Sequence, residues 1–386
     1  MPLIIPIFLM NRGCPHRCIF CNERLTAGDL PERVTEEAFT RTVREYLRGG
    51  ARRKTGPVQI AFYGGTFTGM DPQEQRRLLE LASPFLREGA VDGIRISTRP
   101  DGIDAKGLDL LKAWGVTTVE IGAQSLDDEV LLLAQRGHTV RDIVRALGLL
   151  KGKGFSTGLH LMAGLPGDTP DRFAETVRRT IALRPDTVRI HPTLVLRGTR
   201  LAGDFREGIY RPLALDDAVR ICRDALRALT AAGIPVIRLG LQITRELEEP
   251  GAVVAGPFHP GFGSLVEASL CFEMASALLS AAGPDGDLHR WAGTGRESRP
   301  VALFSLSPAD VTGFSGPQRA NIEALRSGFS LGAIRVHRDP ALPRRTLILE
   351  MGETKLRTDC SGRIRRILLH EKGPHDMDHE TLPTGA

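Results

Sequence analysis

Residues 12–23 read RGCPHRCIFCNE, so Cys14, Cys18 and Cys21 fall within eight positions of one another. The apolar run LIIPIFLM, residues 3–10, comes just before them and predicts a buried first strand. This run is too short to span a bilayer and has no basic segment before it, so it does not match a signal segment. The three cysteines are therefore expected on a loop that directly follows a strand.

The spacing of the cysteines limits what they can bind. Thiolates suit zinc and iron–sulfur clusters, and structural zinc sites and electron-transfer clusters usually take four protein ligands. His16 lies in the same loop and would complete a Cys3His zinc site. Without a fourth ligand, three thiolates leave one iron of a [4Fe-4S] cluster open to a substrate or cofactor. The absence of a paired CxxC elsewhere in the sequence favours the cluster over zinc.

The remaining cysteines, Cys222, Cys271 and Cys360, are scattered. In a chain of 386 residues they predict neither a disulfide framework nor a second cluster. We therefore expect the protein in a reducing cytoplasm, without a membrane partner. The hydrophobic share of 41% is ordinary for a globular protein with a sizeable core.

The formal net charge of +5 permits a polyanionic partner without requiring one. Basic clusters at residues 52–54, 344–345 and 363–366 would serve as phosphate contacts if they met on one face. A solvated, arginine-rich surface is the alternative interpretation.

Short apolar runs alternate with amphipathic stretches along the first half of the chain. Six strands are predicted, at residues 3–10, 58–65, 93–99, 117–125, 156–166 and 187–193. Helices are predicted between them, at residues 35–50, 71–89, 104–115, 139–154 and 169–183. This alternation predicts an α/β fold with a parallel sheet, a partial (β/α)6 barrel of the TIM type. The loops after the strands are then the functional edge.

The pattern changes after about residue 200 and suggests four parts. The partial barrel is expected at residues 1–200, with the cluster loop at 14–21, and an extension of the barrel at residues 201–284. A smaller C-terminal α/β module is expected at residues 285–370, and a tail at 371–386.

The CxxxCxxC pattern, with Phe20 before its last cysteine, resembles the signature of the radical S-adenosylmethionine (SAM) superfamily. The resemblance implies that Cys14, Cys18 and Cys21 hold a [4Fe-4S] cluster whose open iron chelates the amino and carboxylate groups of SAM. It also implies reductive cleavage of SAM to methionine and a 5′-deoxyadenosyl radical. An external one-electron reductant of the flavodoxin or ferredoxin type would supply the electron.

The same resemblance suggests which other residues contact the cofactors. The segment YGGTF, residues 63–67, is similar to the glycine-rich motif of the family, and QRGHT, residues 135–139, contains an arginine suited to the SAM carboxylate. Ordinary structural roles are the alternative: strand-end capping for Ser97 and Gln124, surface exposure for Arg136 and core packing for Met162. The expected cofactor contacts are Phe20, Gly64, Gly65, Thr66, Ser97, Gln124, Arg136 and Met162.

Three histidines, His138, His160 and His191, fall at or near strand-end loops. Each has a possible place near the reaction centre, although packing or capping is the commoner role.

Beyond the cofactor motifs, residues 3–245 resemble the radical domain of Elp3-like proteins, the catalytic subunit of Elongator and its relatives. The segments IRISTRPDGID (residues 94–104), VEIGAQSLDDEVL (119–131) and HPTLVLRGTRLAGDF (191–205) carry this resemblance. It implies modification of the wobble uridine of tRNA. The compact cysteine spacing and the lack of a QxxGxG-like segment after residue 250 depart from the Elp3 pattern and put acetyl-CoA chemistry in doubt.

STRPDG (residues 97–102), GAQS (122–125) and GLPGDT (164–169) also resemble the oxygen-independent coproporphyrinogen dehydrogenase group. That group implies either a tetrapyrrole enzyme or a haem-binding chaperone with little turnover. Both stand as alternatives to an enzyme that modifies tRNA.

Overall fold

The computed structural model describes residues 3–9, 13–15, 17–28, 33–50, 56–283 and 299–367. The chain divides into two compact units, residues 1–263 and 264–386, and each unit is described by itself. The predicted boundaries at residues 200, 284 and 370 stay predictions. The predicted tail, residues 371–386, lies outside the described residues.

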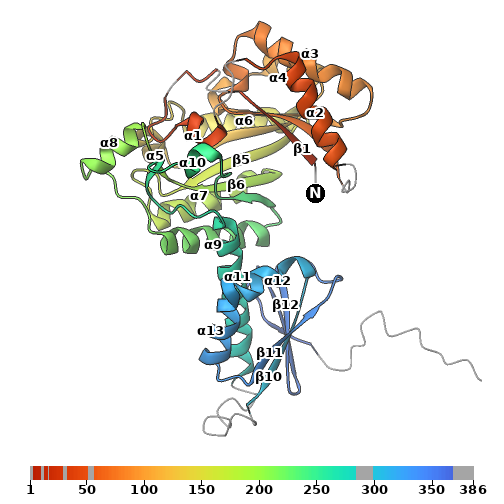
Figure 1. Ribbon diagram of the computed structural model, residues 1–386, viewed down its shortest axis with the longest axis vertical. Helices are drawn as coiled ribbons and strands as arrows, with labels where there is room; N and C mark the ends of the chain where they lie inside the picture. Colours follow the sequence, from red (N-terminus) through yellow and green to blue (C-terminus); the bar gives the residue numbers. More distant parts are fainter. Residues whose placement is uncertain are drawn as a thin grey trace, which may run out of the picture. The chain divides into compact units, whose positions relative to one another are not determined.

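The first unit is built on one parallel sheet whose strands follow one another in sequence order (Figure 1). The strands are β1 (Leu3–Phe8), β2 (Val58–Tyr63), β3 (Gly93–Thr98), β4 (Val116–Gln124), β5 (Ser156–Ala163), β6 (Thr187–Pro192) and β8 (Val236–Leu239). Six of these seven strands are the predicted ones, and β8 extends the sheet beside β6.

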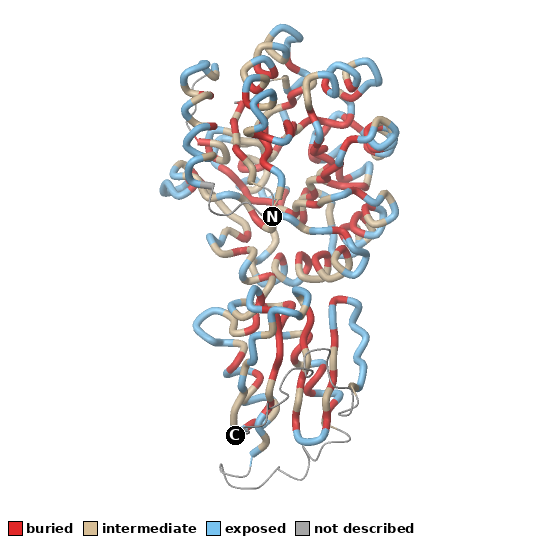
Figure 2. The backbone as a smooth tube through the Cα atoms, turned by 90° about the vertical axis from the view of Figure 1, so that its right-hand side faces the viewer, coloured by how far each residue is buried: buried red, intermediate tan, exposed pale blue. Residues whose placement is uncertain are grey.

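Helices connect consecutive strands and begin where the sequence places capping residues. Asp71 and Thr139 accept backbone N–H groups of the first turns that follow them, and Thr139 forms a capping box with Asp142. Figure 2 shows buried residues along the strands and exposed ones on the outer surfaces of the helices. The connecting helices are α2 (Glu36–Gly50), α3 (Pro72–Arg87), α4 (Ala105–Ala113), α6 (Val140–Gly152), α7 (Pro170–Leu183) and α9 (Leu215–Ala231).

Shorter elements cluster around the loops that follow the strands. They are α1 (Glu23–Ala27), α5 (Asp128–Leu133), α8 (Arg200–Arg206), α10 (Arg245–Glu248), the 3-10 turns η2 (Phe67–Gly69) and η3 (Pro100–Gly102), and the small pair β7 (Val195–Leu196) and β9 (Val253–Ala255).

The parallel sheet is curled, so that side chains from distant strands meet on its inner face. Tyr63 ends β2 and Arg189 lies on β6, four strands away, a separation of about 19 Å in a flat sheet. Arg189 Nη2 nevertheless donates to the Tyr63 hydroxyl at 2.5 Å, and the guanidinium lies 4.8 Å from the ring centroid. Contact over this separation requires strong curvature, which confirms the predicted partial barrel.

A buried carboxylate lies at the centre of this inner face. Glu120 on β4 is 0% exposed. It accepts hydrogen bonds from Arg95 and Arg189, and His160 Nε2 lies 2.9 Å from its other oxygen. We call the charged and polar group on this face the lumen cluster: Tyr63, Arg95, Glu120, His160, Arg189 and Arg238.

Burial alone would raise the pKa of Glu120. The hydrogen bond and charge of His160, with the charges of Arg189 and Arg95, outweigh burial and lower the pKa to about 2. Filled barrels pack their interiors with branched aliphatic side chains. The charged interior here is therefore a departure that calls for a functional reason.

The second unit is an α/β module. Its sheet has the order β11-β10-β12-β13-β14, with β10 and β11 parallel and the other neighbours antiparallel. Phe304 on β10 packs against Phe314, with ring centroids 4.9 Å apart. The elements are α11 (Phe262–Ala282), β10 (Val301–Leu306), η6 (Pro308–Asp310), α12 (Val311–Ser315), η7 (Pro317–Arg319), α13 (Ala320–Gly328), β11 (Ala333–Arg338), β12 (Thr346–Met351), β13 (Thr354–Asp359) and β14 (Arg365–Arg366).

Within the part of the chain that the structure describes, one helix, α11, is long and apolar enough to cross a membrane. Half of its apolar window is buried inside the structure, and Leu270, Ala275 and Leu278 are 0% exposed. A buried core helix has the same length and composition, so this is weak evidence for a membrane span.

We predict that Glu120→Gln destabilises the first unit by about 3–5 kcal/mol at pH 7, because it leaves buried arginines without their counter-charge. The folded pKa of about 2 lies below the unfolded value of about 4.3. The contribution of ionised Glu120 to the free energy of unfolding is thus present above pH ~4.3 and is lost as the pH falls through 2. Denaturant unfolding at pH 7 and at decreasing acidic pH should show the variant and the wild type converging.

Glu175→Gln is the matched control for this prediction. Glu175 also has a pKa lowered to about 2, by Arg178 and Arg179, but it lies on the surface, where ion pairs contribute little. Equal stability of Glu120→Gln and the wild type at pH 7 would contradict the role of the lumen cluster.

Candidate active site

The cysteine loop docks closely against the loop that follows β2. Gly13 has φ +74°, and a Cβ atom there would lie 2.2 Å from the carbonyl oxygen of Thr66. A Cβ atom at Gly69 would lie 2.2 Å from the carbonyl oxygen of Gly13. The two loops can approach this closely because both positions are glycine.

The cysteines have different partners on the surrounding loops. Cys14 is exposed, and its Sγ lies 3.3 Å from Thr66 Oγ1. Cys18 is half-buried, and its Sγ accepts a hydrogen bond from Arg136 Nη1 at 2.8 Å. All six cysteines of the chain are free thiols.

Desolvation of the sulfur atom raises the pKa of two of these thiols, although Cys14 is exposed as a whole residue. For Cys14 the hydrogen bond from Thr66 opposes the effect of burial, and the charge of Glu23 adds to it. Burial and then Glu23 raise the pKa of Cys21 to about 12. Both thiols are therefore protonated at neutral pH, and a metal or cluster that bound them would displace protons.

Arg136 links the cysteine loop to the end of β4. Besides Cys18, it donates from Nη2 to the carbonyl oxygen of Gly122 at 2.7 Å. A Cβ atom at Gly122 would lie 3.3 Å from both the Arg136 guanidinium and the Gln124 amide, so the missing side chain leaves room for them. Arg136 Nε and Gln124 Oε1 are buried without a hydrogen-bond partner in the described structure. Gln124 also has φ +65°, which is uncommon for a residue with a side chain.

The glycine-rich turn after β2 faces the end of the cysteine loop. Gly64 has φ +81°, and a Cβ atom there would lie 2.9 Å from the carbonyl oxygen of Leu9. Gly65 N–H donates to Glu23 Oε1 at 2.7 Å. Glu23, two residues after Cys21, is a contact that the sequence analysis did not identify.

Phe20 and Met162 belong to the same apolar cluster. Both pack against the buried residues Val130, Ala134 and Leu165. The apolar wall that they form joins the cysteine loop to the end of β5.

Ser97 has a different position from the other predicted contacts. It lies near the end of β3, half-buried and paired in register with Glu120. Its neighbour Thr98 reaches the loop after β2, with its Oγ1 2.6 Å from Thr68 Oγ1.

The histidines occupy separate places in the barrel. His138 is buried, and burial followed by the charges of Arg136 and Arg99 lowers its pKa to about 3. His160 belongs to the lumen cluster, and its ring lies 6.2 Å from that of His191. Burial and the neighbouring positive groups lower the pKa of His191 to about 3 as well.

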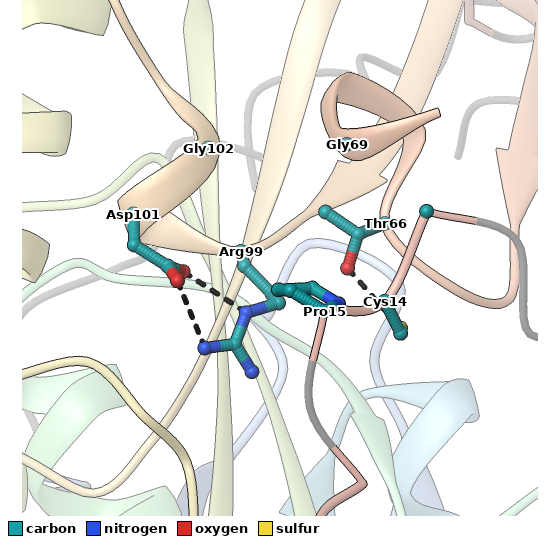
Figure 3. A pocket seen from close by; sticks show the side chains of 8 residues that line it. Cys14, Pro15, Thr66, Gly69, Arg99, Asp101 and Gly102 are labelled. Atoms are coloured by element: carbon teal, nitrogen blue, oxygen red, sulfur yellow. Dashed lines mark hydrogen bonds and ion pairs between the residues drawn. The ribbon is translucent and has the colours of Figure 1, made fainter. Parts of the chain in front are cut away.

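A pocket of about 310 Å³ opens beside Cys14 (Figure 3). Arg99 and Asp101, which the sequence analysis did not select, form a two-pronged ion pair on one wall. Their position in the segment after β3 was the available signal, because loops of this edge carry active sites. The pocket is lined by Gly13, Cys14, Pro15, Thr66, Gly69, Arg99, Asp101 and Gly102.

In the described part of the chain, no group of three or more His, Cys, Asp or Glu side chains is arranged to hold a metal ion. His16, the possible fourth ligand for zinc, lies outside the described residues.

Comparison with known families matches two consecutive segments of the chain. Residues 8–180 match the family described as the Radical SAM superfamily, and residues 185–271 match the Radical_SAM C-terminal domain. The two matches together extend over more than half of the chain.

Curated relatives include proteins that act on tRNA. The chain is 26% identical over 302 residues to a tRNA uridine(34) acetyltransferase from Methanocaldococcus infernus. This match covers 64% of this chain and 57% of the relative. It is 34% identical over 162 residues to Elongator complex protein 3 of Homo sapiens, covering 41% of this chain and 29% of the relative. The chain spans about half the length of two archaeal tRNA uridine(34) acetyltransferases that it matches.

A solved structure of archaeal Elp3 from Methanocaldococcus infernus, with an N-terminal deletion, has the same fold. The TM-score is 0.53 at 22% identity, with 70% of this chain and 62% of the other covered. The family matches, the curled parallel sheet and the cysteine loop at its edge lead to one conclusion: the chain belongs to the radical SAM superfamily of enzymes and has Elp3-type relatives.

Proposed function

We propose that this protein is a radical SAM enzyme that holds a [4Fe-4S] cluster on Cys14, Cys18 and Cys21, cleaves SAM reductively and acts on tRNA. The observation that carries the proposal is the setting of the three thiols. They lie on one short loop, with the guanidinium of Arg136 on Cys18 and a pocket beside Cys14.

The residues around the loop fit the cluster and its ligand. A four-iron cluster takes one thiolate per iron, so the cysteines need to surround it rather than converge on a single ion. The buried, unpartnered Arg136 Nε and Gln124 Oε1 offer a donor and an acceptor to a bound molecule. A ligand with both carboxylate and amino or hydroxyl groups, such as SAM, would satisfy both atoms.

When bound, the cluster would supply the electron that cleaves SAM to methionine and a 5′-deoxyadenosyl radical. The protein's own residues bind and orient. Arg136 holds the Cys18 sulfur by a hydrogen bond and would offer a charge-assisted contact to the SAM carboxylate. The turn at Gly64, Gly65 and Thr66 would let backbone groups approach the methionine amino group, because glycine has no side chain to block the contact.

The remaining contacts of the proposal lie along the carboxyl edge of the sheet. Ser97 and Gln124 would bind the methionine and ribose, and the apolar wall of Phe20 and Met162 would lie along the adenine. An external flavodoxin- or ferredoxin-type reductant and a reducing cytoplasm complete the proposal. Free thiols throughout the chain support the latter.

We predict that Cys18→Ala abolishes both the cluster absorbance after anaerobic reconstitution and the production of 5′-deoxyadenosine from SAM under dithionite. The alanine removes one of three iron ligands and the partner of Arg136. The measurement is the iron content, the visible absorbance and chromatography of the products.

Cys222→Ala is the matched control, because Cys222 is a thiol buried in α9. It should retain the cluster and the cleavage. Cleavage by Cys18→Ala at the wild-type rate would overturn the proposal. A wild-type protein that binds SAM without cleaving it would favour the haem-chaperone alternative.

The tRNA part of the proposal rests on the relatives and on charge. Of the basic clusters in the sequence, residues 52–54 lie outside the described residues. Arg344 and Arg345 pair with Asp310 and Glu267. Arg363 and Arg365 are exposed, so they are the better candidates for phosphate contacts.

We predict that bulk tRNA binds with an affinity that falls steeply with salt, because each phosphate contact adds about 0.7–0.9 to the slope of log K against log salt. The double variant Arg363→Gln/Arg365→Gln should reduce the slope by roughly 2. Arg178→Gln, an exposed arginine paired with Glu175, should leave the slope unchanged. Filter binding between 50 and 300 mM salt measures both effects, and salt-independent binding would count against an RNA substrate.

A further inference from the structure

Two arginines of the lumen cluster lie side by side, and Arg238 forms no ion pair with a carboxylate of the described residues. Arg189 on β6 and Arg238 on β8 are partners in register, and both are partly buried. Like charges directly opposite each other on neighbouring strands are destabilising. Burial and the charge of Arg189 both lower the pKa of Arg238.

The single carboxylate of the cluster does not balance this charge. Glu120 is shared among Arg95, Arg189 and His160. Arg238 donates to the neutral amide of Gln242 at 3.2 Å. Three guanidinium groups and one carboxylate together carry a net charge of +2, to which His160 adds when it is protonated.

An unused hydrogen-bond donor lies in the same place. Arg189 Nε is buried without a partner in the described structure. Arginine is always protonated, so this atom is a donor that lacks an acceptor. A buried donor without an acceptor is destabilising, and a bound acceptor removes the cost.

The position of the pair connects it with the candidate active site. Arg189 donates to the hydroxyl of Tyr63, and Tyr63 directly precedes the turn at Gly64. A group held by Arg189 and Arg238 would thus lie on the inner face of the barrel, below the loops proposed to bind SAM.

We infer that Arg189 and Arg238 form a subsite for an oxyanion of the substrate, a carboxylate or a phosphate. Two guanidinium forks match the planar or tetrahedral oxygens of these groups with paired N–H donors. The inference deepens the proposed function and rests on it, since it assigns the substrate to the inner face of the barrel.

The test is thermal unfolding of the full chain, without SAM or reductant, in sodium phosphate, sodium acetate and sodium chloride at equal ionic strength. A ligand that binds the folded state raises the melting temperature. For each protein, the anion effect is the melting temperature in phosphate or acetate minus the melting temperature in chloride. We expect the anion effect of the wild type to exceed that of Arg238→Met by roughly 2–4 °C. Phosphate stabilises most proteins because it is excluded from their surface. This general effect is shared by the wild type and the variant, so the difference between their anion effects reports specific binding.

The variant has a second signature. Arg238→Met removes a repelling charge, so it should melt at a higher temperature than the wild type in chloride. Arg220→Met, an exposed arginine paired with Asp217, is the matched control and should keep the wild-type anion effect. If Arg238→Met does not fold, Arg238→Lys replaces it, because it keeps the charge but loses the fork; its anion effect should fall below half.

The outcomes separate the possible ligands and the two proposals. A larger effect of acetate indicates a substrate carboxylate, and a larger effect of phosphate indicates a substrate phosphate. An equal anion effect in Arg238→Met and the wild type overturns the subsite. Failure to form 5′-deoxyadenosine would overturn the proposed SAM chemistry. It would leave the melting temperatures unaffected, because they are measured without SAM or reductant.

Discussion

The compensation of one buried carboxylate by neighbouring positive groups holds the inner face of this barrel together. Glu120 accepts from Arg95 on β3 and Arg189 on β6 and contacts His160 on β5. A carboxylate without these partners would be protonated or would draw water into the core. Because the partners come from separate strands, the same contacts hold the curvature of the sheet, and the curvature brings the loops after the strands around one centre.

The second constraint is steric and acts at the edge of the sheet. Gly13 and Gly69 permit a backbone approach that any side chain would block. This approach puts Cys14 beside Thr66, while Arg136 donates a hydrogen bond to Cys18. Cys14 and Cys18 are thereby positioned by two separate loops, although they belong to one short segment. Preorganisation of this kind would suit the cluster proposed for this loop, because few degrees of freedom remain to be lost on binding.

Much of this architecture follows from local sequence. The alternation of apolar runs and amphipathic stretches, with caps such as Asp71 and Thr139, predicts the strands, the helices and the edge that carries the site. The lumen cluster was not predicted, because Glu120 and Arg189 look like ordinary polar residues of a strand until curvature brings β2 to β6. Arg99 and Asp101 were missed for a related reason, since a pocket is a property of several loops. Thr98 rather than Ser97 faces the neighbouring loop, a choice that depends on strand orientation at a single residue.

The charged interior also bears on what the barrel is for. An apolar lining would have stabilised the fold more simply, since replacing buried ion pairs by packed hydrophobic residues is often neutral or favourable. The chain instead keeps Arg189 and Arg238 next to each other, and Arg189 Nε has no hydrogen-bond partner among the described residues. Strain of this kind persists where a ligand relieves it. The cysteine loop at the edge and the unbalanced arginines on the inner face therefore belong to one arrangement, in which the proposed cofactor site lies at the edge of the sheet and the proposed anion subsite lies on its inner face.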